Sequence, residues 1–302
     1  MQARVVVGIP TSFDEAGRVE TASTKKYLEY LRENLVETVM TTAGTSTFNL
    51  MSVDEVHELN HAVVEGFSGE KIIGVPNLSL HHTMEFVEAA ESYMDENTRL
   101  MFLYPERYYQ DETLISFFSE IREGTSREFF IHGKTLRSAT GGSWDYTSSL
   151  INSLHKRGVL CGIKEEHSSL KDSYDFVSNL NKNIDVIVAG GSMRRFEYLS
   201  SAGANSFLSG VGNLFPAVEL EYISGHREAP LKVEKDMFDV FMKIGWHKSL
   251  RVALRYLELT CFHDRAPWPT VTASELAMIE SVVGGIKERI EKEKEKDNEK
   301  IN

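Results

Sequence analysis

The sequence predicts a closed (β/α)8 TIM barrel followed by a C-terminal helical extension. Eight short apolar runs, rich in β-branched and aromatic residues, alternate with amphipathic stretches over about the first 220 residues. The runs are nearly continuous in hydrophobicity, which is typical of parallel strands covered on both faces by helices. No GxGxxG segment follows the first run, as it would in an open dinucleotide-binding sheet. Eight repeats therefore favour a closed barrel over an open sheet.

The expected strands all have this composition and lie at residues 3–10, 37–42, 71–76, 99–105, 128–133, 159–165, 185–190 and 205–210. Between them, Ser52 and Glu55 form a capping box that predicts a helix start. Asp111 is placed to cap a further helix, and residues 170–180 repeat the helical spacing of apolar side chains. Each expected strand is thus followed by an expected helix.

The chain is expected to continue beyond the barrel, which we assign to residues 1–224. Residues 225–290 read as helices packed on the barrel, and Thr272 with Glu275 forms a second capping box. Residues 291–302 are a highly charged run, which we expect to be a disordered tail.

Composition limits the kinds of partner. The chain has 302 residues, of which 41% are hydrophobic and 26% charged, as in ordinary globular proteins. A formal net charge of −12 disfavours general attraction to nucleic acid or to an anionic membrane. Two cysteines form no disulfide framework or zinc spacing, and the N-terminus shows no leader pattern. We expect a cytoplasmic protein with no metal, no cofactor, and no nucleic-acid or membrane partner.

Lys164 is the strongest candidate for a catalytic residue. Active sites of such barrels lie at the carboxyl ends of the strands, and Lys164 ends the sixth expected strand. Burial favours the neutral amine, which can add to a ketone and lose water to give an imine. The alternative is a structural lysine at a strand end, paired with Glu165 or Glu166.

Other polar residues follow the same edge. Arg137 is suited to hold a carboxylate, or is an ordinary loop arginine. His132 is suited to exchange protons near neutral pH, or is a hydrogen-bonded barrel histidine. Tyr104 carries a proton or packs its ring. Residues 45–47, Thr-Ser-Thr, offer hydroxyls to a carboxylate or form a turn.

A third interpretation places a phosphorylated substrate after the seventh strand. There Arg194 and Arg195 would bind the phosphate, as loops at this position do in many barrels. The alternative, which we prefer, is a solvated basic pair on a helix.

Four segments, taken in order, resemble the dihydrodipicolinate synthase / N-acetylneuraminate lyase family of class I aldolases. They are GIPTSFDEAGRVE, LCGIKEEHSSL, VIVAGG with SSAGANSFLSGVGNLFP, and HDRAPWPTVTASE, and they run along almost the whole chain. No segment is specific alone, whereas their order and spacing together are. The resemblance implies a barrel with C-terminal helices, often assembled as a tetramer of tight dimers.

The resemblance also assigns roles. Lys164 matches the imine-forming lysine, and Arg137 matches the carboxylate-binding arginine. His132 stands where the family has a proton-relaying tyrosine, so His132 or Tyr104 is expected to take that catalytic role. Thr45 matches a hydroxyl residue of the family's second-strand motif, whose Gly-Glu end is absent here.

Further substrate-binding positions are expected at Ser46 beside Thr45, at Gly191 after the seventh strand, and at Leu208 on the eighth. The predicted function is a Schiff-base lyase or aldolase acting on pyruvate or another small 2-oxo acid. It cleaves or condenses a C–C bond, or dehydrates its substrate, as a homo-oligomer (dimer or tetramer). The alternative is a catalytically impaired barrel that binds a metabolite as a sensor or structural protein.

Overall fold

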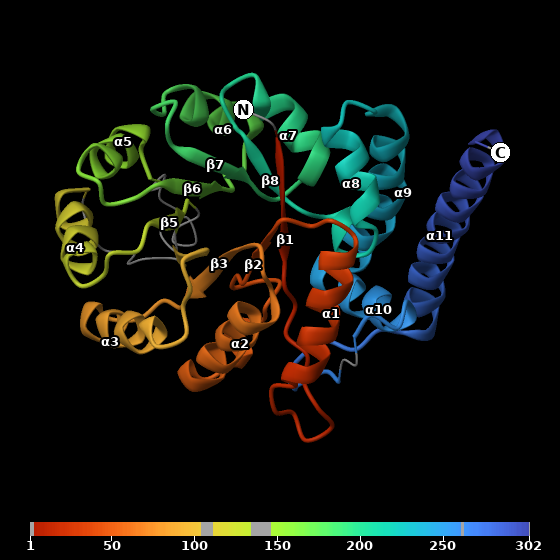
Figure 1. Ribbon diagram of the computed structural model, residues 1–302, viewed down its shortest axis with the longest axis horizontal. Helices are drawn as coiled ribbons and strands as arrows, with labels where there is room; N and C mark the ends of the chain where they lie inside the picture. Colours follow the sequence, from red (N-terminus) through yellow and green to blue (C-terminus); the bar gives the residue numbers. More distant parts are fainter. Residues whose placement is uncertain (1–2, 104–110, 134–145, 261–262, 302) are drawn as a thin grey trace.

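Eight parallel strands close into a barrel in a computed structural model that describes residues 3–103, 111–133, 146–260 and 263–301. Each strand pairs with its sequence neighbours, and β8 pairs with β1 (Figure 1). The strands are β1 (Arg4–Gly8), β2 (Thr38–Met40), β3 (Glu70–Val75), β4 (Thr98–Phe102), β5 (Phe129–His132), β6 (Gly162–Glu165), β7 (Asp185–Val188) and β8 (Ser206–Leu208). The predicted fold class is confirmed, and every expected strand overlaps an observed one.

A ring of helices surrounds the strands, as Figure 1 shows. They are α1 (Thr21–Glu33), α2 (Val53–Gly66), α3 (Leu80–Glu91), α4 (Asp111–Glu123), α5 (Ser148–Lys156), α6 (Leu170–Ser178), α7 (Ser192–Ser200) and α8 (Pro216–Ile223), with the 3-10 helices η1 (Phe48–Leu50) and η3 (Val211–Asn213). The first capping box is confirmed: Glu55 N–H donates to Ser52 Oγ at 3.2 Å, and Ser52 N–H donates to Glu55 Oε2 at 2.9 Å.

Close packing between β5 and β6 explains why residue 162 is a glycine. A Cβ on Gly162, at the start of β6, would lie 2.2 Å from Phe130 Cε1 and 2.6 Å from the backbone oxygen of Asp185. Phe130 on β5 is buried in the barrel core. Only glycine therefore lets β6 sit beside the Phe130 ring, two residues before Lys164.

Three helices form the C-terminal extension: α9 (Glu228–Ile244), α10 (Trp246–Tyr256) and α11 (Ala273–Ile301). The second capping box is present, with Thr272 and Glu275 exchanging hydrogen bonds of 2.7 and 3.2 Å. Helix α11 continues to Ile301, through the charged segment that we expected to be disordered. Alternating Glu and Lys are good helix formers, and pairs such as Glu288–Lys292 support the helix. The division into 1–224 and 225–290 stays a prediction.

Two arginines attach this extension to loops at the carboxyl end of the barrel. Arg251 on α10 is buried and donates to the backbone oxygen of Thr11 at 2.8 Å and to Asp264 at 2.9 Å. Arg265 donates to the backbone oxygen of Leu50 at 2.6 Å and pairs with Glu55. These contacts hold α10 against the loops that follow β1 and β2.

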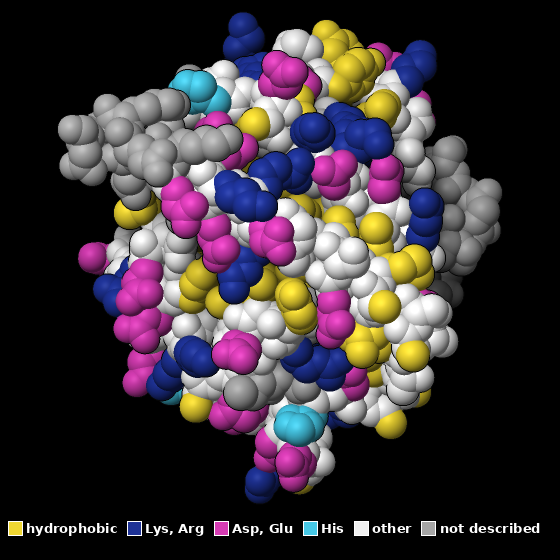
Figure 2. Space-filling model, turned by 90° about the vertical axis from the view of Figure 1, so that its right-hand side faces the viewer, with side chains coloured by type: hydrophobic (Ala, Val, Ile, Leu, Met, Phe, Trp, Pro, Cys, Tyr) yellow, Lys and Arg dark blue, Asp and Glu magenta, His cyan; other side chains and the backbone are white. Residues whose placement is uncertain are grey.

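Figure 2 shows the outer face on the side of α11, where acidic and basic side chains are interspersed with small hydrophobic groups. Among the described residues, no helix has the length and apolar character needed to cross a membrane.

Candidate active site

A cavity of about 340 Å³ opens at the carboxyl ends of the strands. Its barrel side comes from the loops and strand ends after β2, β6, β7 and β8, and its other side from α9 and α10. The residues that line it are Thr42, Gly44, Thr45, Lys164, Glu166, Ala189, Gly190, Gly191, Ser192, Leu208, Ser209, Gly210, Phe238, Met242, Trp246 and His247. Both the position and the size are typical of a small-molecule site in a barrel.

Lys164, His132 and Glu166 form a triangle of side chains in hydrogen-bond contact. Its Nζ is 2.9 Å from His132 Nε2 and 2.8 Å from Glu166 Oε2, and these two atoms are 2.8 Å from each other. The lysine is 3% exposed and the histidine 1%. A nearly buried amine thus faces the cavity, in contact with an imidazole and a carboxylate.

Strand geometry explains why Glu166, and not Glu165, meets the lysine. Side chains alternate across a strand, so residues 164 and 166 point to the same side and residue 165 to the other. Burial alone would raise the pKa of Glu166, but the charge of Lys164 and the hydrogen bond from His132 outweigh it, and the net pKa is lowered. Glu166 is therefore a carboxylate at neutral pH.

Glu165 points outward, where it anchors a second buried pair. Arg195 Nη2 lies 3.2 Å from both of its oxygens, and the carboxylate also accepts the His167 backbone N–H at 2.7 Å. Arg195 also donates to the backbone oxygen of His167 at 2.7 Å. Its guanidinium is thus engaged inside the protein and does not face the cavity.

The start of α7 is already occupied by a carboxylate. Glu234, from α9, accepts the backbone N–H of Arg194 at 3.2 Å, and its charge lies where a phosphate would bind a helix N-terminus. The Arg194 side chain is 59% exposed and reaches Glu234 at 3.8 Å. These carboxylates argue against the phosphate interpretation of Arg194 and Arg195. The preferred alternative, a solvated basic pair, fits Arg194 but not Arg195, whose side chain is 10% exposed.

Glu219 fixes two loops that line the cavity. This buried carboxylate on α8 accepts Ser192 Oγ and the Gly210 N–H, each at 2.9 Å. Burial raises the pKa of Glu219. Burial, together with the neighbouring charge of Glu219, raises the pKa of Glu234 to about 7. The floor of the site after β7 and β8 thus rests on two buried glutamates.

The other expected site residues, substrate-binding and catalytic, separate into three groups. Thr45, Gly191 and Leu208 line the cavity with Lys164. Ser46 is completely buried and uses its hydroxyl internally: it donates to the Ile9 backbone oxygen at 2.5 Å and accepts the Thr42 N–H at 2.9 Å. Its contacts join the loops after β1 and β2. Tyr104 and Arg137 lie outside the described residues.

Among the cavity residues that were not expected at the site, two have ionisable side chains, Glu166 and His247. The alternation of side chains along a strand is a signal that points to Glu166 once Lys164 is chosen. His247 comes from α10, and Gly44 makes room for it: a Cβ there would lie 2.7 Å from His247 Nε2. Burial lowers the pKa of His247, so the imidazole is neutral at neutral pH.

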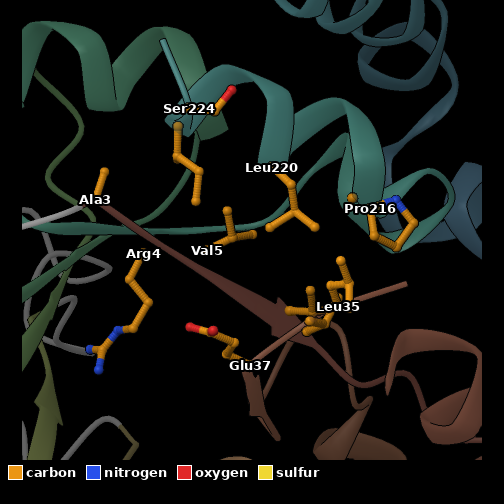
Figure 3. A pocket seen from close by; sticks show the side chains of 12 residues that line it. Ala3, Arg4, Val5, Leu35, Glu37, Pro216, Leu220 and Ser224 are labelled. Atoms are coloured by element: carbon orange, nitrogen blue, oxygen red, sulfur yellow. The ribbon is translucent and has the colours of Figure 1, made fainter. Parts of the chain in front are cut away.

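A second cavity, of about 440 Å³, lies near the amino end of β1 (Figure 3). Arg4 and Glu37 are its charged lining residues, beside apolar side chains such as Leu35, Pro216 and Leu220. The Arg4 guanidinium is paired with Glu70 at 2.7 Å and with Asp185. Since the amino-terminal face of such barrels serves stability, we place the candidate site at Lys164.

The fold and this site together define a class: (β/α)8 barrels that carry a buried lysine at the carboxyl end of the sixth strand. The model of the dihydrodipicolinate synthetase family matches residues 1–283. The chain therefore belongs to the dihydrodipicolinate synthetase family, an aldolase and lyase family.

Its relatives are distant in sequence. The 4-hydroxy-tetrahydrodipicolinate synthase of Thermosipho melanesiensis is 26% identical over 233 residues, which cover 74% of this chain and 77% of the relative. The enzyme of the same name from Methanothermobacter thermautotrophicus is 24% identical over 262 residues, covering 83% and 89%. Identities this low leave the reaction of this chain to be argued from its own residues.

Solved structures agree in fold. The 4-hydroxy-tetrahydrodipicolinate synthase of Methylacidiphilum fumariolicum SolV superposes with a TM-score of 0.79 at 20% identity, over 97% of this chain and 98% of that one. A prophage protein of E. coli K12 from the same family, solved in complex with pyruvate, gives 0.80 at 14% identity, over 94% and 98%. At these identities the likeness shows the shared barrel with its C-terminal helices.

Proposed function

We propose that the protein is a Schiff-base-forming lyase or aldolase that acts on pyruvate or another small 2-oxo acid. The observation that carries the proposal is the buried Lys164 amine. It faces the cavity and lies in hydrogen-bond contact with His132 and Glu166. The pairing with Glu166 alone would also fit a structural lysine, whereas the place of the amine on the cavity, at the carboxyl end of β6, favours a chemical role.

The reaction begins with proton transfer. Lys164 must lose a proton before it attacks, and Glu166 Oε2, 2.8 Å from Nζ, is placed to take it. The neutral amine then adds to the C2 carbonyl of the oxo acid. The resulting hydroxyl is protonated and leaves as water, which gives the protonated imine.

The imine acts as an electron sink. In cleavage, the C3–C4 bond breaks, its electron pair moves into the C2–C3 enamine, and the C4 hydroxyl loses a proton as the aldehyde forms. In condensation, the same steps run in reverse. Each of these steps balances with the groups named here.

His132 is proposed to replace the tyrosine that the family uses for proton relay. The imidazole contacts both the amine and Glu166, and an imidazole exchanges protons near neutral pH. Thr45, at the cavity wall, offers a hydroxyl for the substrate carboxylate. The complex of the E. coli prophage relative with pyruvate supports the substrate class.

Reductive trapping tests the proposal. The protein is incubated with pyruvate and cyanoborohydride, and the adduct is located by intact and peptide mass spectrometry. We expect an adduct on the Lys164 peptide that Lys164→Ala abolishes. The control Lys171→Ala, which changes a lysine that is 81% exposed, should keep the adduct.

The outcomes separate the two hypotheses. Failure to trap pyruvate and a panel of other 2-oxo acids would contradict the aldolase proposal. Trapping without any turnover would instead favour a barrel that binds a metabolite as a sensor or structural protein. Assembly as a homo-oligomer and residence in the cytoplasm remain predictions, which sedimentation and fractionation would check.

A further inference from the structure

The side of the cavity formed by the C-terminal helices differs in chemistry from the barrel side. Phe238 and Met242 on α9 and Trp246 on α10 line it together with His247. None of these four side chains carries a charge at neutral pH. The barrel side, by contrast, places Lys164 and Glu166 in the same cavity.

The aromatic part of this wall is packed in place. The Phe238 and Trp246 rings lie 4.8 Å apart between centroids, and Trp246 also contacts Phe241 at 5.6 Å. Phe238 Cε2 approaches Gly210 so closely that a Cβ there would lie 3.0 Å from it. The rings are thus held between the extension and the loop after β8, and form a pre-shaped surface.

Met242 extends the same apolar surface towards solvent. Its side chain lines the cavity, and the residue is 63% exposed. Methionine adapts to irregular apolar shapes and makes favourable contacts with aromatic rings. An exposed methionine beside two aromatic rings at a cavity gains most when an apolar group covers it.

The cavity also exceeds the needs of the smallest 2-oxo acid. A volume of about 340 Å³ falls within the ~300–1,000 Å³ range of sites that enclose drug-sized ligands. A three-carbon acid bound to Lys164 fills only the polar end of such a site. The remaining space lies along Phe238, Met242 and Trp246.

We infer that this wall is a subsite for an aromatic group carried on C4 of the substrate, so that the cleaved or condensed partner is an aryl aldehyde. The inference rests on the proposed function, whose imine at Lys164 anchors the other end. In cleavage the aryl aldehyde leaves along Phe238 and Trp246. His247 is the polar residue of this wall.

Paired substrates test the inference without requiring turnover. The second-order rate constant for reductive trapping is measured for 2-oxo-4-phenylbutanoate and for 2-oxopentanoate, which differ in the group at C4. We expect the aryl acid to react at least about tenfold faster, a difference of ~1.4 kcal/mol. The ratio of the two constants cancels general effects on the lysine.

Two variants locate the effect. Phe238→Ala and Met242→Ser should each lower the aryl-to-alkyl ratio by at least about threefold, and the double variant should bring it near one. Met278→Ser, a matched change on α11 where the methionine is 48% exposed, should leave the ratio unchanged. Because Met242 is largely exposed, its variant tests the subsite even if Phe238→Ala lowers the melting temperature.

Equal rate constants in the unmodified protein, or a ratio that both variants leave intact, would overturn the subsite. In either case trapping of the two acids would still support the proposed function. Failure to trap any 2-oxo acid would instead overturn the proposed function itself.

Discussion

We expect the Glu166 carboxylate, 2.8 Å from Lys164 Nζ, to affect the pH dependence of the proposed imine formation. Glu166→Gln keeps the size of the side chain and one oxygen near Nζ, but removes the charge that lies 2.8 Å from the ammonium. Two unit charges at about 4 Å interact by ~4 kcal/mol at an effective dielectric constant of ~20. Since Glu166 is 26% exposed, water screens part of this energy.

We therefore expect a shift of about one to two pH units, which is at the lower end of what an opposite charge produces at this distance. The sign follows from the charge: without the carboxylate the ammonium is less stable, so the neutral amine is available at lower pH. The rate of pyruvate trapping, measured from about pH 6 to pH 10, should rise with a midpoint shifted down by that amount. If Glu166 also accepts the proton, the plateau rate should fall.

Glu128→Gln is the matched control. Glu128 is an ion-paired glutamate at the amino end of β5, 3.2 Å from Arg99 and 63% exposed, and its change should leave the midpoint in place. An unchanged midpoint in Glu166→Gln would refute the argument that this carboxylate sets the protonation state of the amine. A shift to higher pH would refute its sign.

Two further predictions concern the support of the site. Glu234, whose pKa is raised from 4.5 to about 7, binds a proton in the folded state more tightly than in the unfolded state, so its contribution to stability is lost as pH rises through that window. Glu234→Gln should hence gain stability relative to the unmodified protein at about pH 8 but not at about pH 4, by up to ~3 kcal/mol. Thermal melts at both pH values check this, and an equal difference at both would contradict it. Gly44→Ala should cost ~1–3 kcal/mol, because its Cβ would meet His247 Nε2 at 2.7 Å. Adding His247→Ala should restore most of the melting temperature, and a purely additive loss would show that the two residues do not meet.

The order of elements was readable from the sequence because it depends on local periodicity. Continuous apolar runs mark strands buried on both faces, and eight of them with intervening helices leave few architectures. The place of Lys164 followed from the same reading, since the carboxyl ends of all strands meet at one face. Thr45, Gly191 and Leu208 reached the cavity for that reason.

The direction of a side chain in a loop follows no such rule. Ser46 adjoins Thr45, yet its hydroxyl is used up by the Ile9 oxygen and the Thr42 N–H. Arg195 looked like a surface cation, but it turns inward to Glu165. In both cases the partner comes from another βα unit, so it becomes visible only when the barrel closes.

The sequence by itself determined the barrel, its C-terminal helices and a lysine at the carboxyl edge of the strands. Only the tertiary structure decided that His132 and Glu166 flank the amine, that Glu234 occupies the start of α7, and that α9 and α10 bring Phe238 and His247 to the cavity. The physical reason is range. Periodicity and capping act within a few residues, whereas these contacts join segments far apart in the chain and exist only when the extension is docked on the closed barrel.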